Sequence, residues 1–444
     1  MQNIKQNLKE TIKLAIPLSL GQFGHILMGI VDTIMVGGLG AASLAAAAVV
    51  NSVFAVLMVS GIGISLAITP LAAVEKGAKR TGEFSGLLSN SLIINVSFSF
   101  IFAVLLYFGA GVLGHLNQPF EVVKAGIPYL KIVGLSIIPI MVFQTYRQFL
   151  EGISDAKPPM YINLLANIAN AFLNWVLIYG KFGFPEMGLN GAGLATLFTR
   201  TLMAISLYLY VRRSKKYSGI INKFSFKAYD ISKIKKLLSI GIPSGLQLIT
   251  EVSAFSFIGI MIGWIGTIEL AAHQIALNLA SATFMVMLGI SAAGTIRVGN
   301  AVGEKNNNKI RSAGFSSIIL CVGIMFLFAL LLILFKDILP YIYINDYKVV
   351  KVVSRLIIIA AIFQIFDGLQ AASAGVLRGL TDVKVPMFVI FAAYWLIGIP
   401  FGAYLCFYAN FSLYGIWIGI VAALIFVGSV LFLRFNKLSK DFIE

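Results

Sequence analysis

The sequence predicts an all-α integral membrane protein with twelve transmembrane helices in two six-helix repeats around a central cavity. Three observations predict this fold class: the composition, the length of the apolar runs, and a similarity between the two halves of the chain. Apolar residues make up 59% of the 444 residues and charged residues only 12%, about half of the ~25% usual in soluble domains. This composition excludes a water-soluble enzyme, a disordered chain and a secreted disulfide scaffold.

Twelve apolar runs are long enough to cross a bilayer, which takes about 20 residues of helix. The basic N-terminus continues into the first run without a small-residue cleavage site, so we interpret it as part of the first helix and not as a signal peptide. In chain order the runs are residues 14–36, 44–72, 86–113, 127–148, 160–179, 189–211, 238–262, 270–298, 312–335, 353–376, 385–408 and 413–434.

Lysine and arginine are unevenly distributed between the connectors. The even-numbered connectors and the two termini hold 26 of the 34 lysines and arginines. Cytoplasmic loops are enriched in these residues, so we expect both termini on the cytoplasmic side of a cell (inner) membrane. An anionic membrane surface explains the net charge of +16 without nucleic-acid binding, and we expect no nucleic-acid partner.

The two halves of the chain resemble each other. Pro17 corresponds to Pro243 at an offset of 226, as does Gly63-Ile64-Ser65 to Gly289-Ile290-Ser291, and further matches follow at 227. Six runs in each half give the repeats the same orientation, which predicts two lobes related by an axis along the membrane normal. The predicted organisation is an N-terminal lobe (1–211), a cytoplasmic linker (212–236) and a C-terminal lobe (237–444).

Motifs for chemistry on the substrate or for ATP use are absent from the sequence. There is no phosphate-binding G-x-x-x-x-G-K-[ST] and no metalloprotease H-E-x-x-H. We therefore expect no enzyme and no ATP-driven pump. A duplicated membrane protein without an ATPase motif indicates an ion-driven secondary transporter.

Three carboxylates lie well inside the apolar runs: Asp32, Glu251 and Asp367. A charge in the middle of a bilayer costs roughly 2.5–3.5 kcal/mol on insertion scales. Each is either paired or close to a helix end and facing water, or it binds cations. We favour cation binding, with these carboxylates serving both the coupling ion and the substrate.

Polar neighbours accompany the carboxylates. Gln247 lies one helical turn before Glu251, and Gln364 and Gln370 flank Asp367. A polar stripe also follows one face of the fifth run, formed by Asn163, Asn167, Asn170 and Asn174. The stripe either bonds helices together or coordinates an ion beside Asp32.

Four further polar residues lie within the runs or at their ends. His25, two turns before Asp32, is either a proton relay or a satisfied polar contact. Arg200 is a gate or a structural anchor. For His273 and Gln274, at the start of the eighth run, we favour a structural role.

Several motifs resemble the NorM branch of the MATE (multidrug and toxic compound extrusion) transporters. They are Val31-Asp32-Thr33-Ile34-Met35-Val36-Gly37, the segment 170–180, Ala271-Ala272-His273-Gln274-Ile275-Ala276-Leu277-Asn278, and the segment 296–304. The resemblance extends from the first run to the twelfth. It implies a V-shaped bundle of two lobes that exports organic cations, including drugs and dyes, in exchange for sodium or protons.

The resemblance also implies site residues. Glu251 and Asp367 match a cation site in the C-terminal lobe, and Asp32 matches the acid of the N-terminal lobe. A second ion site is implied at Asn170, Asn174 and Thr196. The sequence departs from the family pattern at Asn174, where some archaeal relatives have Asp, and at His25, where an uncharged residue is expected.

We expect sodium as the coupling ion, bound at Glu251 and Asp367, because hard cations need several oxygen ligands; a proton needs one carboxylate and stays the alternative. No cofactor is expected besides the coupling ion, and we expect a monomer in the lipid bilayer. The alternative functions are a flippase for lipid-linked precursors from the same superfamily, and a channel.

Overall fold

The computed structural model describes residues 2–116, 118–218, 229–440 and 442. Within these ranges the regular elements are helices and no strand occurs. Twelve helical segments are long and apolar enough to span a membrane, which confirms the predicted all-α fold with twelve spans. Most are longer than the apolar runs: α1 is Gln2–Gly37 where the sequence predicts 14–36.

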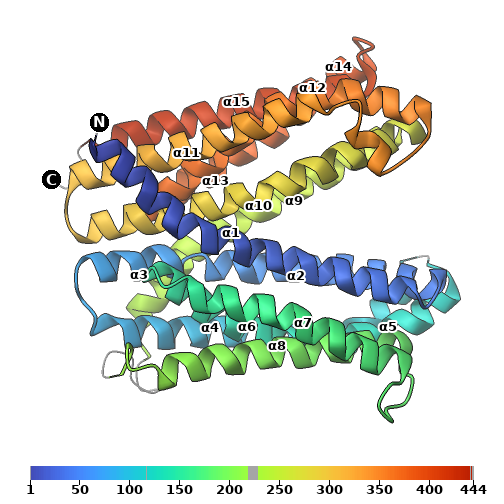
Figure 1. The fold of residues 1–444 in the computed structure, drawn as a ribbon, viewed down its shortest axis with the longest axis horizontal. Helices are drawn as coiled ribbons and strands as arrows, with labels where there is room; N and C mark the ends of the chain where they lie inside the picture. Colours follow the sequence, from blue (N-terminus) through green and yellow to red (C-terminus); the bar gives the residue numbers. More distant parts are fainter. Residues whose placement is uncertain (1, 117, 219–228, 441, 443–444) are drawn as a thin grey trace. The chain divides into compact units, whose positions relative to one another are not determined.

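Six spans make up the first repeat, and three of them are built from two helical pieces each (Figure 1). The predicted linker is partly helical, because α8 continues to Arg213 and the next helix begins at Ile231; its residues 219–228 lie outside the described ranges. The elements are α1, α2 (Ala41–Ser65), α3 (Ile68–Gly77), α4 (Glu83–Phe108), η1 (Gly109–His115), α5 (Phe120–Leu135), α6 (Ile137–Gly152), α7 (Lys157–Tyr179) and α8 (Gly188–Arg213).

The second repeat has the same order of spans. Its fifth span is divided by a π-helical segment between two α-helices, whereas the fifth span of the first repeat, α7, is a single helix. The elements are α9 (Ile231–Gly263), α10 (Thr267–Gly303), α11 (Asn307–Leu334), η3 (Leu339–Ile342), α12 (Tyr347–Gly379), α13 (Lys384–Phe391), η4 (Ala392–Gly398), α14 (Ile399–Phe407) and α15 (Ser412–Leu438).

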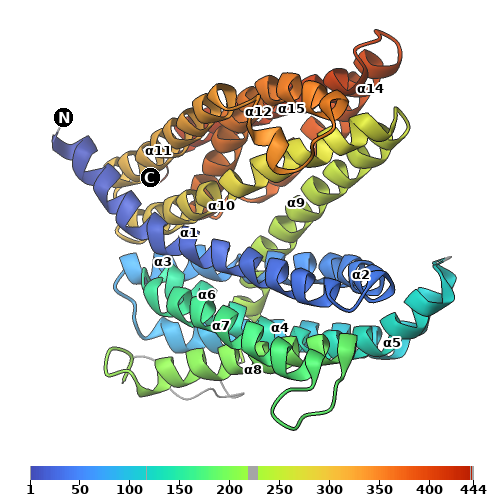
Figure 2. The ribbon, with the colours of Figure 1, turned by 45° about the vertical axis from the view of Figure 1, so that its right-hand side comes forward.

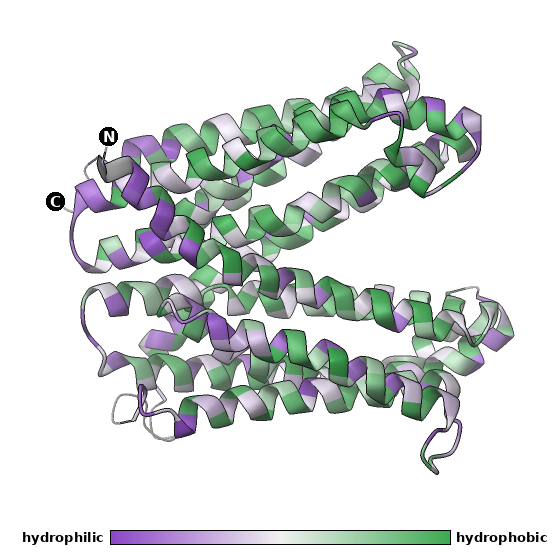
Figure 3. Cartoon of the chain, in the orientation of Figure 1, coloured by the Kyte–Doolittle hydropathy of each residue, from purple (hydrophilic) through white to green (hydrophobic). Residues whose placement is uncertain are grey.

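Hydrophobic residues dominate the middle of the helices, and hydrophilic residues gather towards their ends (Figure 3). Prolines lie beside three of the divided spans, whereas the division between α4 and η1 at Gly109 has no proline beside it. A proline has no N–H to donate to the carbonyl four residues earlier. Pro70, Pro139 and Pro400 each follow an interruption by a few residues, at Leu66–Ala67, at Ser136 and in η4.

Equivalent contacts confirm the internal duplication in space. Thr69 donates from Oγ1 to the carbonyl of Gln148 at 3.1 Å. Thr295, 226 residues later, donates to the carbonyl of Gly375, 227 residues after Gln148, at 2.7 Å. The offset read from the sequence therefore relates side-chain contacts as well as residue types.

The chain forms two compact units, and each takes part of a helix from the other repeat. The N-terminal unit is Leu20–Gly245; the C-terminal unit combines Met1–Ser19 with Leu246–Glu444. The units therefore differ from the predicted boundaries, 1–211 and 237–444, in the first parts of α1 and α9. Both helices nevertheless run on without a break (Figure 2).

Close backbone contacts explain this exchange of helix segments. In the N-terminal unit Gly63 of α2 lies against Gly245 of α9, so closely that a Cβ on Gly63 would be 2.7 Å from the Gly245 nitrogen. In the C-terminal unit Gly289 of α10 faces Ser19 of α1 in the same way, with 2.6 Å to the Ser19 nitrogen. Only glycine permits such an approach.

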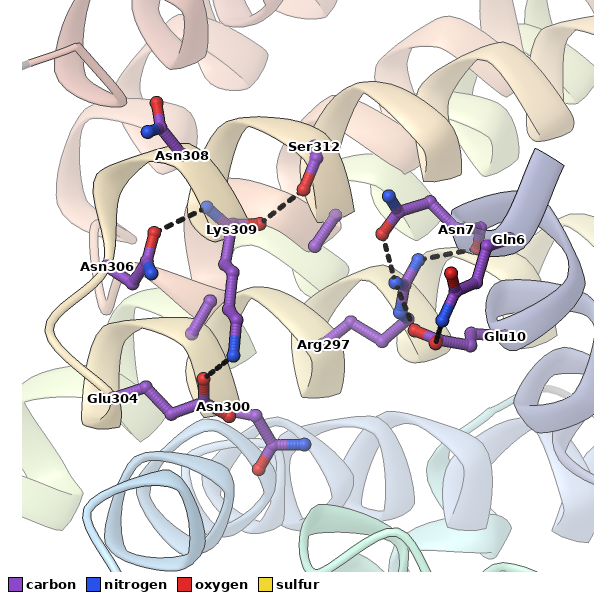
Figure 4. A pocket seen from close by; sticks show the side chains of 12 residues that line it. Gln6, Asn7, Glu10, Arg297, Asn300, Glu304, Asn306, Asn308, Lys309 and Ser312 are labelled. Atoms are coloured by element: carbon purple, nitrogen blue, oxygen red, sulfur yellow. Dashed lines mark hydrogen bonds and ion pairs between the residues drawn. The ribbon is translucent and has the colours of Figure 1, made fainter. Parts of the chain in front are cut away.

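Ion pairs of opposite polarity accompany the two contacts. In the C-terminal unit Arg297 of α10 donates to Glu10 of α1 at 2.8 Å and to Asn7 at 2.6 Å, beside a pocket of about 550 Å³ (Figure 4). In the N-terminal unit the charge is reversed, since Lys233 of α9 pairs with Glu83 of α4 at 2.7 Å. In the C-terminal unit α1 thus contributes the acid of the pair, whereas in the N-terminal unit α9 contributes the base.

Candidate functional site

Asp32 is the centre of a polar cluster in the N-terminal unit. Asn174 of α7 donates from Nδ2 to Asp32 Oδ1 at 2.6 Å and to Asn170 Oδ1 at 3.1 Å. Thr196 of α8 is 3.5 Å from Asp32 Oδ2, at the limit of a hydrogen bond. The structure therefore brings Asp32 together with Asn170, Asn174 and Thr196, the residues implied as an ion site of the N-terminal lobe.

The asparagine stripe of α7 makes different contacts along its length. Asn163 donates to the carbonyl of Gly21 in α1 at 2.7 Å, and Asn167 donates to the carbonyl of Asn163 at 2.8 Å. Asn163 therefore joins α7 to α1, whereas the hydrogen bond of Asn167 lies within α7. Asn170 and Asn174, both fully buried, belong to the Asp32 cluster. The stripe therefore bonds α7 to α1 at Asn163, and its other end lies beside Asp32, where coordination of an ion stays a prediction.

An oxygen of this cluster has no partner. Asn174 Oδ1 is buried and makes no hydrogen bond with the described residues. Such an amide oxygen, next to a carboxylate and a hydroxyl, is the kind of ligand that a hard cation uses. A buried polar atom without a partner is unfavourable, so the cluster is suited to accept a ligand at this position.

Arg200, one turn after Thr196 on α8, donates to Ser136 Oγ at 2.6 Å. Ser136 lies at the interruption between α5 and α6. The guanidinium also lies over the ring of Phe54, 5.0 Å from its centroid. Arg200 is therefore anchored at the break in the fourth span, near the Asp32 cluster.

Glu251 is the centre of a second cluster, in the C-terminal unit. Its Oε1 accepts from Gln247 Nε2 at 3.2 Å and from Gln370 Nε2 of α12 at 3.1 Å. Tyr394 in turn donates to Gln370 Oε1 at 3.2 Å. The hydrogen-bonded chain therefore links α9, α12 and the π-helical segment η4.

The π-helical segment contributes two aromatic residues that the sequence analysis did not identify. Tyr394 packs against Phe255 at 5.8 Å between ring centroids, and Trp395 donates to the carbonyl of Thr250 at 3.4 Å. π-helical turns are frequent at functional sites. The sequence signal for this segment is the aromatic pair followed by Gly398 and Pro400.

Asp367 lies on α12, one turn before Gln370, and its charge interacts with that of Glu251. It makes no hydrogen bond or ion pair with any residue that the structure describes. Gln364 does not contact it: its Nε2 points to Met325 Sδ at 3.8 Å, and its Oε1 is buried without a partner. Two neighbouring carboxylates, one of them without a hydrogen-bond partner, favour the uptake of a cation between them.

The remaining predicted residues lie apart from these contacts. His25 is half-buried and makes no hydrogen bond with the described residues, so the structure does not join it to Asp32. His273 is fully buried and accepts at Nδ1 from Trp417 at 3.2 Å, as a structural residue does. Gln274 is exposed.

Arg147 and Arg378, which are among the 26 basic residues counted with the even-numbered connectors and the termini, lie inside helices. Arg147 pairs with Glu151 of the same helix, α6, at 2.7 Å, with side chains only 5% and 7% exposed. Arg378 lies in the last turn of α12 and interacts electrostatically with Glu251. Arg378 lies beyond the tenth apolar run, which ends at 376, because α12 continues to Gly379. Arg147 already lies within the fourth run, 127–148.

In the described ranges no group of three or more His, Cys, Asp or Glu side chains could hold a metal ion. The clusters have a different composition. Each combines one or two carboxylates with neutral amides, and the Asp32 cluster adds a hydroxyl. An alkali cation is bound by oxygen ligands of this kind.

The chain has twelve spans in two repeats, and each repeat holds a carboxylate that accepts hydrogen bonds from amides. This combination defines a duplicated polytopic membrane protein of the transporter class. The MatE family matches residues 17–176 and 243–404, one match in each repeat. The first residues of the two matches, 17 and 243, are related by the repeat offset of 226. The chain belongs to the MatE family.

Relatives are similar over nearly their whole length. The chain is 33% identical over 441 residues to a probable multidrug resistance protein NorM of Mesorhizobium japonicum, covering 98% of this chain and 94% of that protein. It is 31% identical over 447 residues to multidrug resistance protein MdtK of Yersinia pseudotuberculosis, covering 99% and 98%.

Solved structures share the fold at lower identity. The eukaryotic MATE transporter AtDTX14 has a TM-score of 0.86 at 21% identity, covering 99% of this chain and 98% of that chain. A MOP superfamily transporter from Pyrococcus furiosus, described as having a binding pocket of reverse polarity, has a TM-score of 0.86 at 22% identity, covering 98% and 96%.

Proposed function

We propose that this protein is a multidrug efflux transporter that exports organic cations in exchange for a coupling cation by alternating access. The observation that carries the proposal is the environment of Glu251. Its hydrogen-bond donors are the neutral amides of Gln247 and Gln370, and a second acid, Asp367, interacts with it. The names of the NorM and MdtK relatives support drugs as substrates.

The chemistry of this cluster suits a lipophilic cation. An ionised carboxylate attracts a cation strongly where water is scarce. The rings of Phe255, Tyr394 and Trp395 near Glu251 can add cation–π attraction of about 0.5–2 kcal/mol. Because Glu251 and Asp367 can bind either the organic cation or the coupling ion, competition between the two couples their movements in opposite directions.

Sodium is the coupling ion in this proposal, bound at Glu251 and Asp367. The two carboxylates supply several oxygen ligands, as a hard cation requires, and the neighbouring glutamines hold Glu251 in position. Exchange of one monovalent organic cation for one sodium ion moves no net charge. The sodium concentration gradient then drives export, or more than one sodium ion enters and the membrane potential adds about 2.3 kcal/mol per charge per 100 mV.

The proposal includes the position in the membrane. We infer a bacterial inner membrane from the MdtK and NorM relatives, with both termini in the cytoplasm because of the distribution of lysine and arginine. One chain contains both repeats and both carboxylate clusters, so a monomer without a further cofactor is sufficient for transport.

Transport assays in proteoliposomes test the function. A fluorescent organic cation loaded into the vesicles should leave faster when a sodium gradient is imposed, in a fixed ratio to sodium entry. A flux of sodium without a fixed ratio would indicate a channel. Movement of a lipid-linked precursor, with no efflux of any organic cation, would indicate the flippase.

A further inference from the structure

We propose that Tyr394 is a positioning residue for Glu251: its hydroxyl holds the side-chain amide of Gln370 so that the NH2 group, and not the carbonyl oxygen, faces the carboxylate. The inference rests on the proposed function where it concerns the affinity for organic cations. Its evidence is the chain of hydrogen bonds that leads from η4 through α12 to α9.

The amide of Gln370 has two ends with opposite hydrogen-bonding character, since the NH2 group donates and the carbonyl oxygen accepts. Gln370 is buried, and each end has its own partner. Nε2 donates to Glu251 Oε1 at 3.1 Å, and Oε1 accepts from the Tyr394 hydroxyl at 3.2 Å. An amide turned by half a rotation would place its carbonyl oxygen against the carboxylate. The hydroxyl of Tyr394 therefore stabilises the one orientation in which Gln370 is a donor to Glu251.

Tyr394 is itself held in a defined position. Its side chain is only 2% exposed, and its ring packs against Phe255 at 5.8 Å between ring centroids. The N–H of Ile399 points to the carbonyl of Tyr394, five residues earlier, where an α-helix would use the residue four positions earlier. Because the wider turn changes the direction in which its side chains leave the helix, η4 determines where the Tyr394 hydroxyl lies.

Close packing against α15 fixes the π-helical segment. A Cβ on Gly398, the last residue of η4, would be 2.8 Å from the Cβ of Ala423 and 3.2 Å from the carbonyl oxygen of Gly419. A Cβ on Gly419 would in turn be 2.5 Å from the carbonyl oxygen of Gly398. Only glycine permits this approach. The backbone that carries Tyr394 is therefore held against α15, while its hydroxyl contacts α12.

The first repeat has no equivalent of this chain. At offsets of 226, 227 and 227 the positions of the acid, the glutamine and the tyrosine are occupied by His25, Phe143 and Asn167. The corresponding span, α7, is a single α-helix, and Asn167 donates to the carbonyl of Asn163 in its own helix at 2.8 Å. The hydroxyl, the amide and the acid thus occur together in one repeat, as expected of groups that act as a unit.

A double-mutant analysis of cation affinity tests this inference. Equilibrium binding of tetraphenylphosphonium, a lipophilic organic cation, is measured with the purified protein. Tyr394→Phe removes only the hydroxyl and should weaken binding by about three- to tenfold, the effect of losing one neutral hydrogen bond. Gln370→Met should weaken binding at least as much. Because Tyr394 acts through Gln370, Tyr394→Phe/Gln370→Met should bind no more weakly than Gln370→Met alone.

Efflux kinetics separate positioning from a loss of structure. In proteoliposomes Tyr394→Phe should raise the KM for the exported cation by the same factor and keep the maximal rate of the wild type, because it weakens binding only. Tyr404→Phe is the matched control: it removes a hydroxyl from α14 at a side chain that is 58% exposed, and it should behave as the wild type. An unchanged KM in Tyr394→Phe would overturn the inference. So would a further loss of affinity when Tyr394→Phe is added to Gln370→Met.

Infrared spectroscopy keeps this inference separate from the proposed function. The carboxyl band of Glu251, identified by its loss in Glu251→Gln, reports the hydrogen bonds that this group accepts and does not require transport. The band should shift in Gln370→Met and, in the same direction, in Tyr394→Phe. A protein that binds and moves no organic cation refutes the function, while this band still decides the role of Tyr394. Conversely, normal efflux together with an unshifted band in Tyr394→Phe refutes the inference and leaves the function intact.

Discussion

Gln370 on α12 donates a hydrogen bond of 3.1 Å to the carboxylate of Glu251 on α9. This contact joins two helices that are more than a hundred residues apart in the chain. It also places Asp367, one turn earlier on α12, where its charge interacts with that of Glu251. The two acids can therefore act on one cation.

Loss of either acid should disable export. Glu251→Gln and Asp367→Asn each remove a charge interaction of about 3 kcal/mol, which corresponds to roughly 100-fold weaker cation binding. We expect normal amounts of protein in the membrane but no resistance to cationic drugs in a pump-deficient host. Asp337→Asn is the matched control, since its side chain is 70% exposed. Full resistance in both site variants would exclude the C-terminal cluster.

The Asp32 cluster should be required as well. Asp32→Asn keeps an oxygen that can accept from Asn174 but removes the negative charge of the cluster, so dye efflux should fall by about tenfold or more. His25 makes no hydrogen bond to this cluster, so His25→Gln should leave the pH dependence of efflux unchanged. A shifted pH profile in His25→Gln would establish the proton relay instead.

The glycine contact between α2 and α9 predicts a stability difference. Gly63→Ala would force a Cβ against Gly245 and should destabilise the protein by about 1–3 kcal/mol, as overpacking does. Gly82→Ala is the control, because a Cβ there meets no atom within 4 Å. Thermal unfolding of both variants in detergent compares them; equal Tm values would contradict the close contact.

Membrane topology can be tested at Ser218, which is exposed just after α8. With Cys321 and Cys406 replaced, a cysteine at this position should not react with an impermeant thiol reagent added to intact cells. It should react after the cells are permeabilised. Strong labelling from outside would place the connector and both termini on the opposite side.

The sequence predicted the spans and the duplication correctly, because bilayer thickness and repeat offsets are local or periodic signals. It did not predict the exchange of α1 and α9 between units, which depends on glycine pairs such as Gly63 and Gly245 that lie far apart in the chain. The ion pair of Arg147 with Glu151 was missed because Glu151 lies beyond the fourth apolar run, which ends at 148, although α6 continues to Gly152 and buries both side chains.

The site residues show the same limit. Asn170, Asn174 and Thr196 were predicted as one site of the N-terminal lobe, and the structure joins them to Asp32. Gln364, in contrast, is turned away from Asp367 towards Met325. Sequence spacing gives the turn of a helix on which a side chain lies, whereas its partner depends on the neighbouring helices.

The sodium dependence of Glu251 tests the account most directly. Dye efflux from proteoliposomes would be measured at fixed pH, with sodium varied from zero to ~100 mM, in the wild type and in Glu251→Gln. Sodium should accelerate efflux in the wild type and have no effect in the variant. Wild-type efflux that follows an imposed pH gradient and ignores sodium would contradict the account.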